Sequence, residues 1–185
     1  MKILIVVDMQ NDFINGALGT PEAAGIVEKV VKRIESSKDE VILFTRDTHQ
    51  ENYLDTPEGK KLPVVHCVEG TSGWEINESI QNAWKQNTDT IVLPELRENT
   101  FNKDVFGSVD LVAFLKSYGS EITEIELLGV CTDICVISNS IMIKNTLPNV
   151  EVRVNAACCA GVTPESHTAA LQVMEMCQIE IIGKD

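Results

Sequence analysis

The sequence predicts an α/β fold of three layers, in which helices cover both faces of a six-stranded parallel sheet. Two observations support this prediction: short runs that are apolar throughout, and amphipathic segments of helical length between them. Strands that are apolar at every position are buried on both faces, as in parallel sheets covered by helices. Right-handed crossovers between such strands give a doubly wound, Rossmann-like sheet.

The predicted strands and helices alternate along the chain. The strands are the apolar runs 2–7, 40–45, 90–93, 124–129, 150–155 and 179–182. The helices are the segments 21–37, 73–86, 109–119, 135–145 and 164–177. Pro21 and Pro164 stand where a first helical turn accepts proline, and Thr20 and Thr163 before them are the predicted N-caps.

Size and charge limit the class of protein. With 185 residues, 44% of them hydrophobic, the chain suits one domain over residues 1–185. A net charge of -13 repels phosphate backbones and anionic membranes, so we expect a small-molecule partner rather than nucleic acid or a membrane. The chain has no apolar run of the roughly 18 residues that a membrane span needs, and no signal peptide is evident, which predicts a cytoplasmic protein.

The cysteines are predicted to be thiols rather than disulfides, because no export signal is evident. A structural zinc knuckle is disfavoured, because the sequence has no CxxC pair. Cys158, Cys159 and Cys177 are expected to be small hydrophobic residues of the core. The full set is Cys67, Cys131, Cys135, Cys158, Cys159 and Cys177.

Reactive side chains follow four of the predicted strands. In an open parallel sheet, ligands bind beyond the carboxyl ends of the strands, so these side chains should meet at one edge. In strand order they are Asp8, then Asp47 and His49, then Lys103 about ten residues after the third run, then Cys131 and Cys135.

Three of these residues suit nucleophilic catalysis. A helix N-terminus and a nearby cation favour a thiolate, and here Cys135 begins a predicted helix while Lys103 supplies the cation. Asp8 would take the thiol proton and return it to a leaving amine, and backbone amides in the turn 130–135 would hold the oxyanion. Each residue alone also has a structural explanation, which is the commoner one for Asp8 and Lys103; their joint placement favours catalysis.

A second set suits a metal. Asp47 and His49 are two residues apart and would face one ion from an extended segment, with His66 as the other nearby histidine. Two imidazoles and one carboxylate leave coordination positions open, as catalytic divalent sites do. The alternative is a loop in which the histidines only form hydrogen bonds. Glu51 or Glu58 would be an outer ligand.

Five stretches, in this order, resemble the motifs of the isochorismatase-like cysteine hydrolases, and more specifically their nicotinamidase (pyrazinamidase) branch. The stretches are DMQNDF, RDTHQEN, HCVEGTSG, the lysine of FNKDVFGS, and GVCTDICV, and they span nearly the whole chain. The resemblance implies a catalytic triad and three ligands of a divalent metal. The expected metal is zinc, with manganese, iron or magnesium as alternatives. The implied triad is Asp8, Lys103 and Cys135, and the implied ligands are Asp47, His49 and His66.

The resemblance also implies an activity. In this family a thiolate attacks the amide carbon, ammonia leaves, and water hydrolyses the thioester, while the metal holds the pyridine nitrogen. This implies conversion of nicotinamide to nicotinate in NAD salvage, through a thioester on Cys135. It further implies a cis peptide between Val130 and Cys131, an oxyanion hole formed by the backbone amides of Cys131 and Cys135, and a homo-oligomer, either a dimer or a tetramer.

One position departs from the family pattern. Many nicotinamidases have a tryptophan three residues before the third metal ligand, where this chain has Pro63. Phe13 and Val130 are therefore the expected walls of the substrate pocket. Two alternatives stay open: the same triad acting on another small amide, ureide or enol ether, and a non-catalytic binding or thiol-redox protein that uses Cys131 and Cys135.

Overall fold

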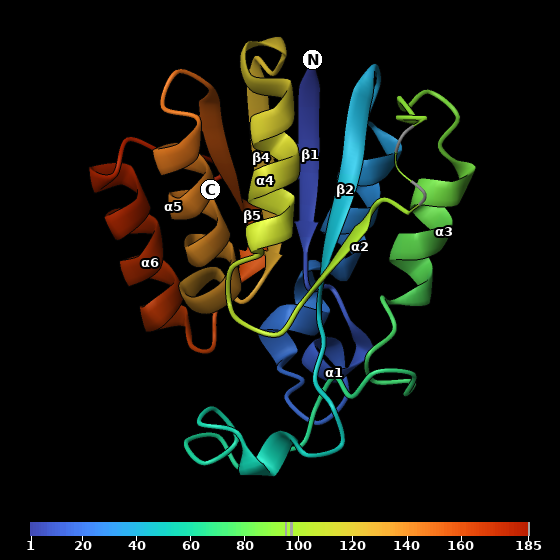
Figure 1. The fold of residues 1–185 in the computed structure, drawn as a ribbon, viewed down its shortest axis with the longest axis vertical. Coiled ribbons are helices and arrows are strands. Elements are labelled where there is room, and N and C mark those ends of the chain that lie inside the picture. Colours follow the sequence, from blue (N-terminus) through green and yellow to red (C-terminus); the bar gives the residue numbers. More distant parts are fainter. Residues whose placement is uncertain (95, 97, 185) are drawn as a thin grey trace.

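A six-stranded parallel sheet forms the centre of the computed structural model, which describes residues 1–94, 96 and 98–184 (Figure 1). The strand order is β3-β2-β1-β4-β5-β6. The strands are β1 (Lys2–Val7), β2 (Glu40–Asp47), β3 (Thr100–Lys103), β4 (Glu124–Val130), β5 (Glu151–Ala160) and β6 (Glu180–Ile182). The order reverses direction between β1 and β4, so the doubly wound α/β prediction is confirmed.

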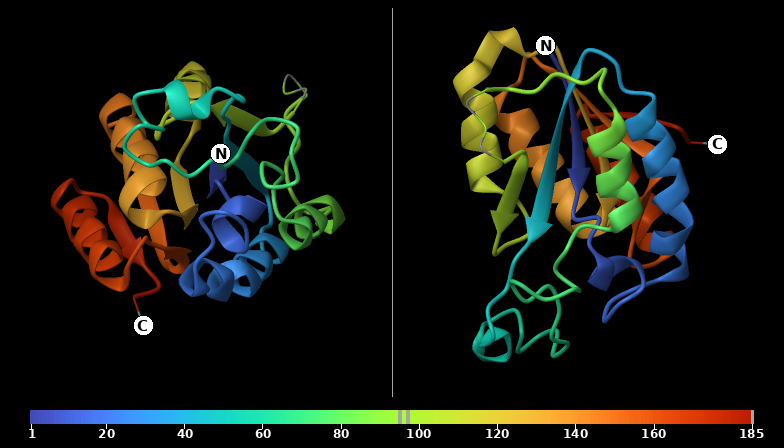
Figure 2. Two further views of the ribbon diagram at one scale, coloured as in Figure 1. Left: turned by 90° about the horizontal axis from the view of Figure 1, so that it is seen from below. Right: turned by 90° about the vertical axis from the view of Figure 1, so that its right-hand side faces the viewer.

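Helices cover both faces of this sheet. The helices are α1 (Asn11–Ile14), α2 (Pro21–Glu35), α3 (Glu78–Gln86), α4 (Val109–Tyr118), α5 (Ile137–Thr146) and α6 (Pro164–Met176), with 3₁₀ turns at Tyr53–Asp55 and Gly119–Glu121 and a π-helix, η3, at Thr132–Val136. Figure 2 shows α2 and α3 on one face and α4, α5 and α6 on the other. None of the described helices combines the length and apolarity needed to cross a membrane.

The predicted helix starts are confirmed at two places. The Thr20 hydroxyl accepts the Ala23 amide at 3.0 Å, and the Thr163 hydroxyl accepts the Ser166 amide at 3.1 Å. Each threonine therefore satisfies one of the backbone N–H groups that a helix N-terminus leaves free. These caps begin α2 and α6.

The third predicted strand, 90–93, is wrong. Ile91 makes only an isolated bridge to Val41, and the strand beside β2 is Thr100–Lys103. Pro94 follows the predicted run directly and lacks the N–H that a continuing ladder needs, while Val92 is 76% exposed. Lys103 consequently ends a strand, which fixes its position more firmly than a loop would.

The two central strands, β1 and β4, end at the same edge of the sheet. The apolar residues of β1 and β4 are almost fully buried. The long connection from β2 to α3 projects beyond that edge, at the bottom of Figure 1. The carboxyl ends of the strands and this loop therefore surround the same space.

Candidate active site

Asp8, Lys103 and Cys135 meet at the carboxyl edge of the sheet. The Lys103 Nζ atom lies 2.7 Å from Asp8 Oδ2 and 3.5 Å from Cys135 Sγ. All three residues are buried, with at most 6% of their surface exposed. The geometry therefore brings together an acid, an amine and a thiol that lie far apart in the sequence.

Each triad residue is positioned by a different element. Asp8 directly follows β1 and has a φ of 48°, in the left-handed region that non-glycine residues seldom adopt. Lys103 is paired with Asp47 across β3 and β2. Cys135 lies in η3, where its carbonyl accepts the Asn139 side-chain amide at 2.8 Å.

Burial and the neighbouring charges together shift the pKa values of all three triad residues. Burial raises the pKa of the Cys135 thiol well above its usual value; the Asp8 carboxylate adds to this, and Lys103 opposes it. It also raises the pKa of Asp8, against the opposing effect of Lys103. Burial would lower the pKa of Lys103, but Asp8, Cys135 and Asp47 hold it well above the usual value. A carboxylate with a raised pKa is a better base for a neighbouring thiol.

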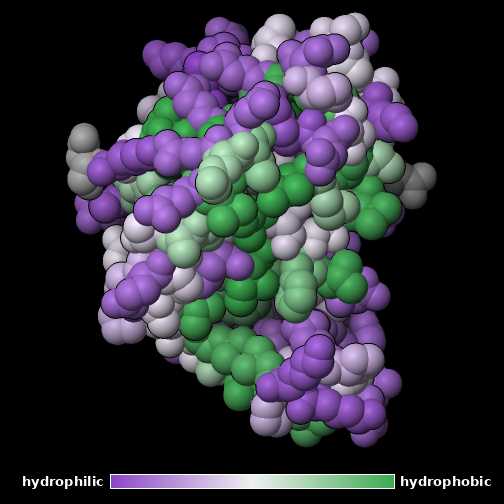
Figure 3. Space-filling view, turned by 90° about the vertical axis from the view of Figure 1, so that its left-hand side faces the viewer, coloured by the Kyte–Doolittle hydropathy of each residue, from purple (hydrophilic) through white to green (hydrophobic). Residues whose placement is uncertain are grey.

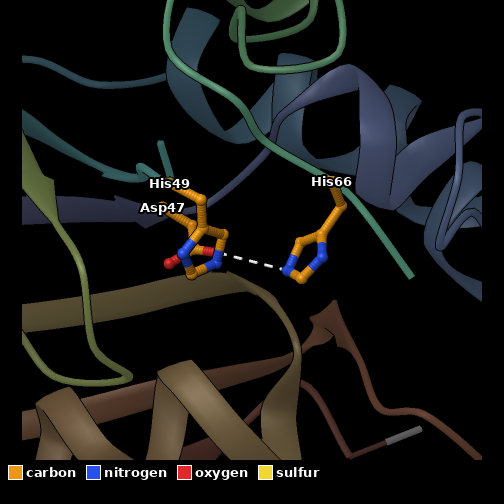
Figure 4. Close-up of side chains that lie close together, drawn as sticks. All are labelled: Asp47, His49 and His66. Carbon is orange, nitrogen blue, oxygen red and sulfur yellow. Dashed lines mark ion pairs between the residues drawn. The ribbon is translucent and has the colours of Figure 1, made fainter. Parts of the chain in front are cut away.

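The predicted metal ligands form a second group beside the triad. The candidate ligand atoms of Asp47, His49 and His66 all lie within 4.8 Å of one another, and Figure 4 shows the three side chains turned toward a common space. Asp47 Oδ2 lies 2.9 Å from His49 Nε2 and 3.5 Å from His66 Nε2. Asp47 Oδ1 lies 3.2 Å from the Lys103 ammonium, so this carboxylate joins the two groups.

This second group fits a divalent metal. His49 Nε2 is buried and has no hydrogen bond of good geometry to any described residue, which leaves its lone pair available. His66 Nδ1 donates to the Val64 carbonyl at 2.8 Å, an arrangement that frees Nε2 for a metal. Ligand atoms within 4.8 Å of one another can surround one ion that is bonded at roughly 2.0–2.2 Å to each.

Charge and packing also hold these ligands in place. Burial alone would raise the pKa of Asp47, but the imidazoles of His49 and His66, with Lys103, hold it well below its usual value. The Tyr53 ring packs against both imidazoles, at centroid distances of 4.5 and 4.9 Å.

The two expected outer ligands differ in position. The Glu58 carboxylate lies 4.0 Å from His49 Nε2 and lines the same cavity as His66. Glu51 is exposed and does not belong to the described group.

A cavity of about 320 Å³ reaches both groups. It touches Cys135 on the triad side and Asp47 and His66 on the metal side. Apolar side chains form most of the remaining wall, and Figure 3 shows a band of hydrophobic residues that runs down the middle of one face of the molecule into its narrower lower part. The other lining residues are Phe13, Leu18, Thr20, Glu58, Leu62, Phe106, Cys131, Ile134 and Val162.

The two predicted wall residues differ in position. Phe13 lines the cavity and packs edge-on against His66, with 5.6 Å between ring centroids. Val130 is fully buried and does not line the cavity, because its side chain belongs to the core around β4. Val130 is therefore corrected from a pocket residue to a core residue.

The turn that carries the nucleophile has an unusual backbone. The peptide bond between Val130 and Cys131 is cis, as the resemblance implies. The Cys131 carbonyl then accepts the amides of Ile134 and Val136 at 3.1 and 3.0 Å. The predicted helix therefore begins as a π-helical turn, with Cys135 inside it, before α5 follows.

Two buried polar residues of the site were not predicted. The Gln10 side chain accepts the Asp47 amide at 2.7 Å and donates to the Asp47 carbonyl at 2.8 Å. The Thr45 hydroxyl donates to Asp8 Oδ1 at 2.7 Å. A signal was available for Thr45, because it is the polar residue that ends the apolar run EVILF within β2.

Comparisons with known proteins found a matching family model and similar proteins. A family model described as Isochorismatase domain matches residues 2–185. The nicotinamidase/pyrazinamidase of Mycobacterium tuberculosis is 27% identical over 200 residues, covering 98% of each chain. The nicotinamidase of Schizosaccharomyces pombe is 26% identical, covering 98% of this chain and 92% of that protein. The crystal structure of the pyrazinamidase of Pyrococcus horikoshii, in complex with zinc, is 28% identical with a TM-score of 0.74, over 98% of both chains.

Proposed function

Because this chain belongs to the isochorismatase domain family, we propose that it is a nicotinamidase, converting nicotinamide to nicotinate and ammonia. One observation carries the proposal: Lys103 Nζ lies 2.7 Å from Asp8 and 3.5 Å from the Cys135 sulfur. The cavity beside that sulfur also reaches Asp47 and His66. Relatives named nicotinamidase that match over nearly their whole length support the same reaction class.

The first half of the reaction forms a thioester. Asp8 takes the proton of the Cys135 thiol as the sulfur attacks the amide carbon, and a C–S bond forms. The backbone amides of Cys131 and Cys135 donate to the oxyanion. Asp8 then gives its proton to the amide nitrogen, the C–N bond breaks, and ammonia leaves.

The second half restores the thiol. Asp8 takes a proton from water as the water oxygen attacks the thioester carbon, and the C–S bond breaks. The acid is released, and Cys135 regains a proton from Asp8. In both halves the Lys103 ammonium stabilises the negative charge that moves between carboxylate and sulfur, in a site from which bulk water is largely excluded.

Three side chains would hold the metal: Asp47, His49 and His66. The two imidazoles and one carboxylate are ligands that suit zinc. When bound, this ion would act as a Lewis acid and orient an electron-pair donor of the substrate, such as a pyridine nitrogen. Phe13 and Leu62 would form the apolar walls against the ring.

The test measures ammonia release from nicotinamide by the metal-loaded protein and by a Cys135→Ala variant. We expect turnover by the wild-type protein only, and a thioester adduct on Cys135 in the intact mass under rapid quench. No turnover of nicotinamide, together with turnover of another amide, would reject the proposed substrate.

A second candidate uses the same triad on a different small amide or ureide. The cavity wall favours it, because Leu62 lines the cavity beside Pro63, where many family members have tryptophan. A panel of pyridine, aliphatic and ureido amides compared by kcat/KM separates the two candidates.

A thiol-redox function has less support. Burial raises the pKa of the Cys131 thiol, which a redox pair would need, to about 12. Redox-active thiols instead have lowered pKa values and are accessible. Intact mass after mild oxidation is therefore expected to show no disulfide between these cysteines.

A further inference from the structure

The two oxygens of the Asp8 carboxylate have different partners. Oδ2 lies 2.7 Å from the Lys103 ammonium, and Oδ1 accepts the Thr45 hydroxyl at 2.7 Å. Thr45 is fully buried, so its hydroxyl does not exchange this bond for one with bulk solvent. Among the described residues, Thr45 is the one outside the triad whose side chain hydrogen-bonds to Asp8.

Thr45 also holds the backbone of Asp8. The Asp8 amide donates to the Thr45 carbonyl at 3.2 Å, and Val7 is paired with Thr45 across β1 and β2. This contact lies at the residue whose φ is 48°, a conformation that surrounding contacts must impose on a non-glycine residue. One residue of β2 thus restrains both the backbone and the carboxylate of Asp8.

The hydroxyl is not needed to form the strand. Val41, Ile42, Leu43 and Phe44 precede Thr45 in β2, and a valine at 45 would have the same branched shape and suit the same buried surface. A hydroxyl buried here is disfavoured unless it forms a hydrogen bond, and its partner in this structure is Asp8. The Thr45 hydroxyl is therefore explained by its hydrogen bond to the Asp8 carboxylate.

We propose that Thr45 is a positioning residue for the reaction, and this inference rests on the proposed role of Asp8 as the base. The χ2 torsion of an aspartate is broad, so a carboxylate bound at one oxygen only can rotate. The Thr45 hydroxyl holds Oδ1 and thereby keeps Oδ2 at Lys103, which in turn contacts Cys135. Without it, the carboxylate spends less time in the geometry that proton transfer requires.

The test compares Thr45→Val, which removes the hydroxyl, with Thr45→Ser, which retains it. For Thr45→Val we expect kcat to fall roughly tenfold or more with KM nearly unchanged, because a hydrogen bond to a charged group is lost at the base and not at the substrate. Thr45→Ser should keep kcat within about threefold of the wild type. Thr146→Val is the matched control: its hydroxyl donates to the Met142 carbonyl at 2.8 Å in α5, away from the site, and kcat should not change.

A second readout does not depend on any substrate. The rate at which iodoacetamide alkylates Cys135, followed by peptide mass, reports how readily this thiol ionises beside Asp8. We expect Thr45→Val to slow alkylation about threefold or more, with Thr45→Ser close to the wild type. If Thr45→Val does not fold, Thr45→Ala is compared with Thr45→Ser in the same assays.

The outcomes separate this inference from the proposed function. Wild-type protein that does not hydrolyse nicotinamide, but shows the expected differences in alkylation, overturns the substrate and supports the role of Thr45. A Thr45→Val variant with wild-type kcat and alkylation overturns the role of Thr45. So does equal impairment of the valine and serine variants, or an effect confined to KM.

Discussion

Buried and half-buried charges lie toward both ends of the central sheet, and the two clusters are built differently. Toward the amino ends, the Arg33 guanidinium donates to Glu126 at 3.0 and 2.8 Å and to Glu40 at 3.0 and 3.1 Å. Its Nη1 atom also donates to the Ser37 hydroxyl at 2.8 Å. All three guanidinium nitrogens therefore have partners, and this cluster fits a structural role.

The cluster at the carboxyl ends is less completely satisfied. Lys103 contacts two carboxylates and a thiol, and the nearby His49 Nε2 forms no hydrogen bond of good geometry with any described residue. A cavity reaches this cluster, whereas the Arg33 cluster lies against α2 and the strands. Buried charge alone does not identify a functional site. A nucleophile, a histidine nitrogen that is available to a metal, and an adjoining cavity together do.

The largest expected effect comes from removing the amine of the carboxyl-end cluster. Lys103→Met should lower kcat/KM about 100-fold to 1,000-fold, because Asp8 and the sulfur lose the cation that stabilises their shared charge. Ammonia release by folded protein measures this. Lys32→Met, which removes an exposed partner of Glu28, is the control and should retain activity. Near-wild-type activity of Lys103→Met would show that the two clusters do not differ in function.

The matching change at the other cluster should affect stability instead. Arg33→Met leaves Glu40 and Glu126 half-buried or buried without a cation, and we expect the free energy of unfolding to fall by about 3 kcal/mol. Urea denaturation measures the loss, and kcat per folded molecule should stay near the wild-type value. A large fall in kcat at full stability would assign Arg33 a role in the reaction.

The carboxyl-end residues could largely be predicted, because strand ends follow from apolar runs. Asp8, Asp47 and Cys135 each come directly or soon after such a run, and the structure places them together. Lys103 was also predicted, but from a strand at 90–93 that the structure replaces with 100–103. The edge strand β3 is only partly buried, so its sequence TFNK lacks the apolar signal that identifies the central strands.

Other features depended on contacts between strands. Thr45 and Gln10 act on residues 37 positions away in the sequence, through pairings that hydrophobic periodicity does not reveal. Val130 is predicted as a pocket residue, but both faces of β4 are buried, and Val130 belongs to the core cluster.

The next largest effect is expected on metal binding by the cluster at the carboxyl ends. His49→Gln removes the unpartnered Nε2 atom, and we expect the affinity for zinc to fall about 10-fold to 100-fold or more, since one of three protein ligands is lost. Metal per chain after dialysis against limiting zinc, measured by mass spectrometry, checks this. His167→Gln is the control, because His167 hydrogen-bonds to Thr132 at 2.8 Å outside the group. Equal metal content in both variants would contradict the assigned ligands.

The smallest expected effect concerns the apolar wall between the two functional groups. Phe13 lines the cavity and would form a wall against the bound ring, so Phe13→Leu keeps an apolar wall but loses the aromatic contact with that ring. Aromatic pairs contribute about 1 kcal/mol beyond buried area, which predicts a KM for nicotinamide roughly fivefold higher with kcat within about twofold. Initial rates over a range of nicotinamide concentrations measure both constants.

The control for this change is a phenylalanine in an aromatic cluster elsewhere. Phe114 packs against Phe101 and Tyr118, at centroid distances of 5.3 and 5.2 Å, and does not line the cavity. Phe114→Leu should therefore lower the free energy of unfolding without changing KM. If instead Phe13→Leu lowers kcat and leaves KM unchanged, the wall orients the reacting amide rather than binding the ring, and Phe13 belongs functionally with the triad.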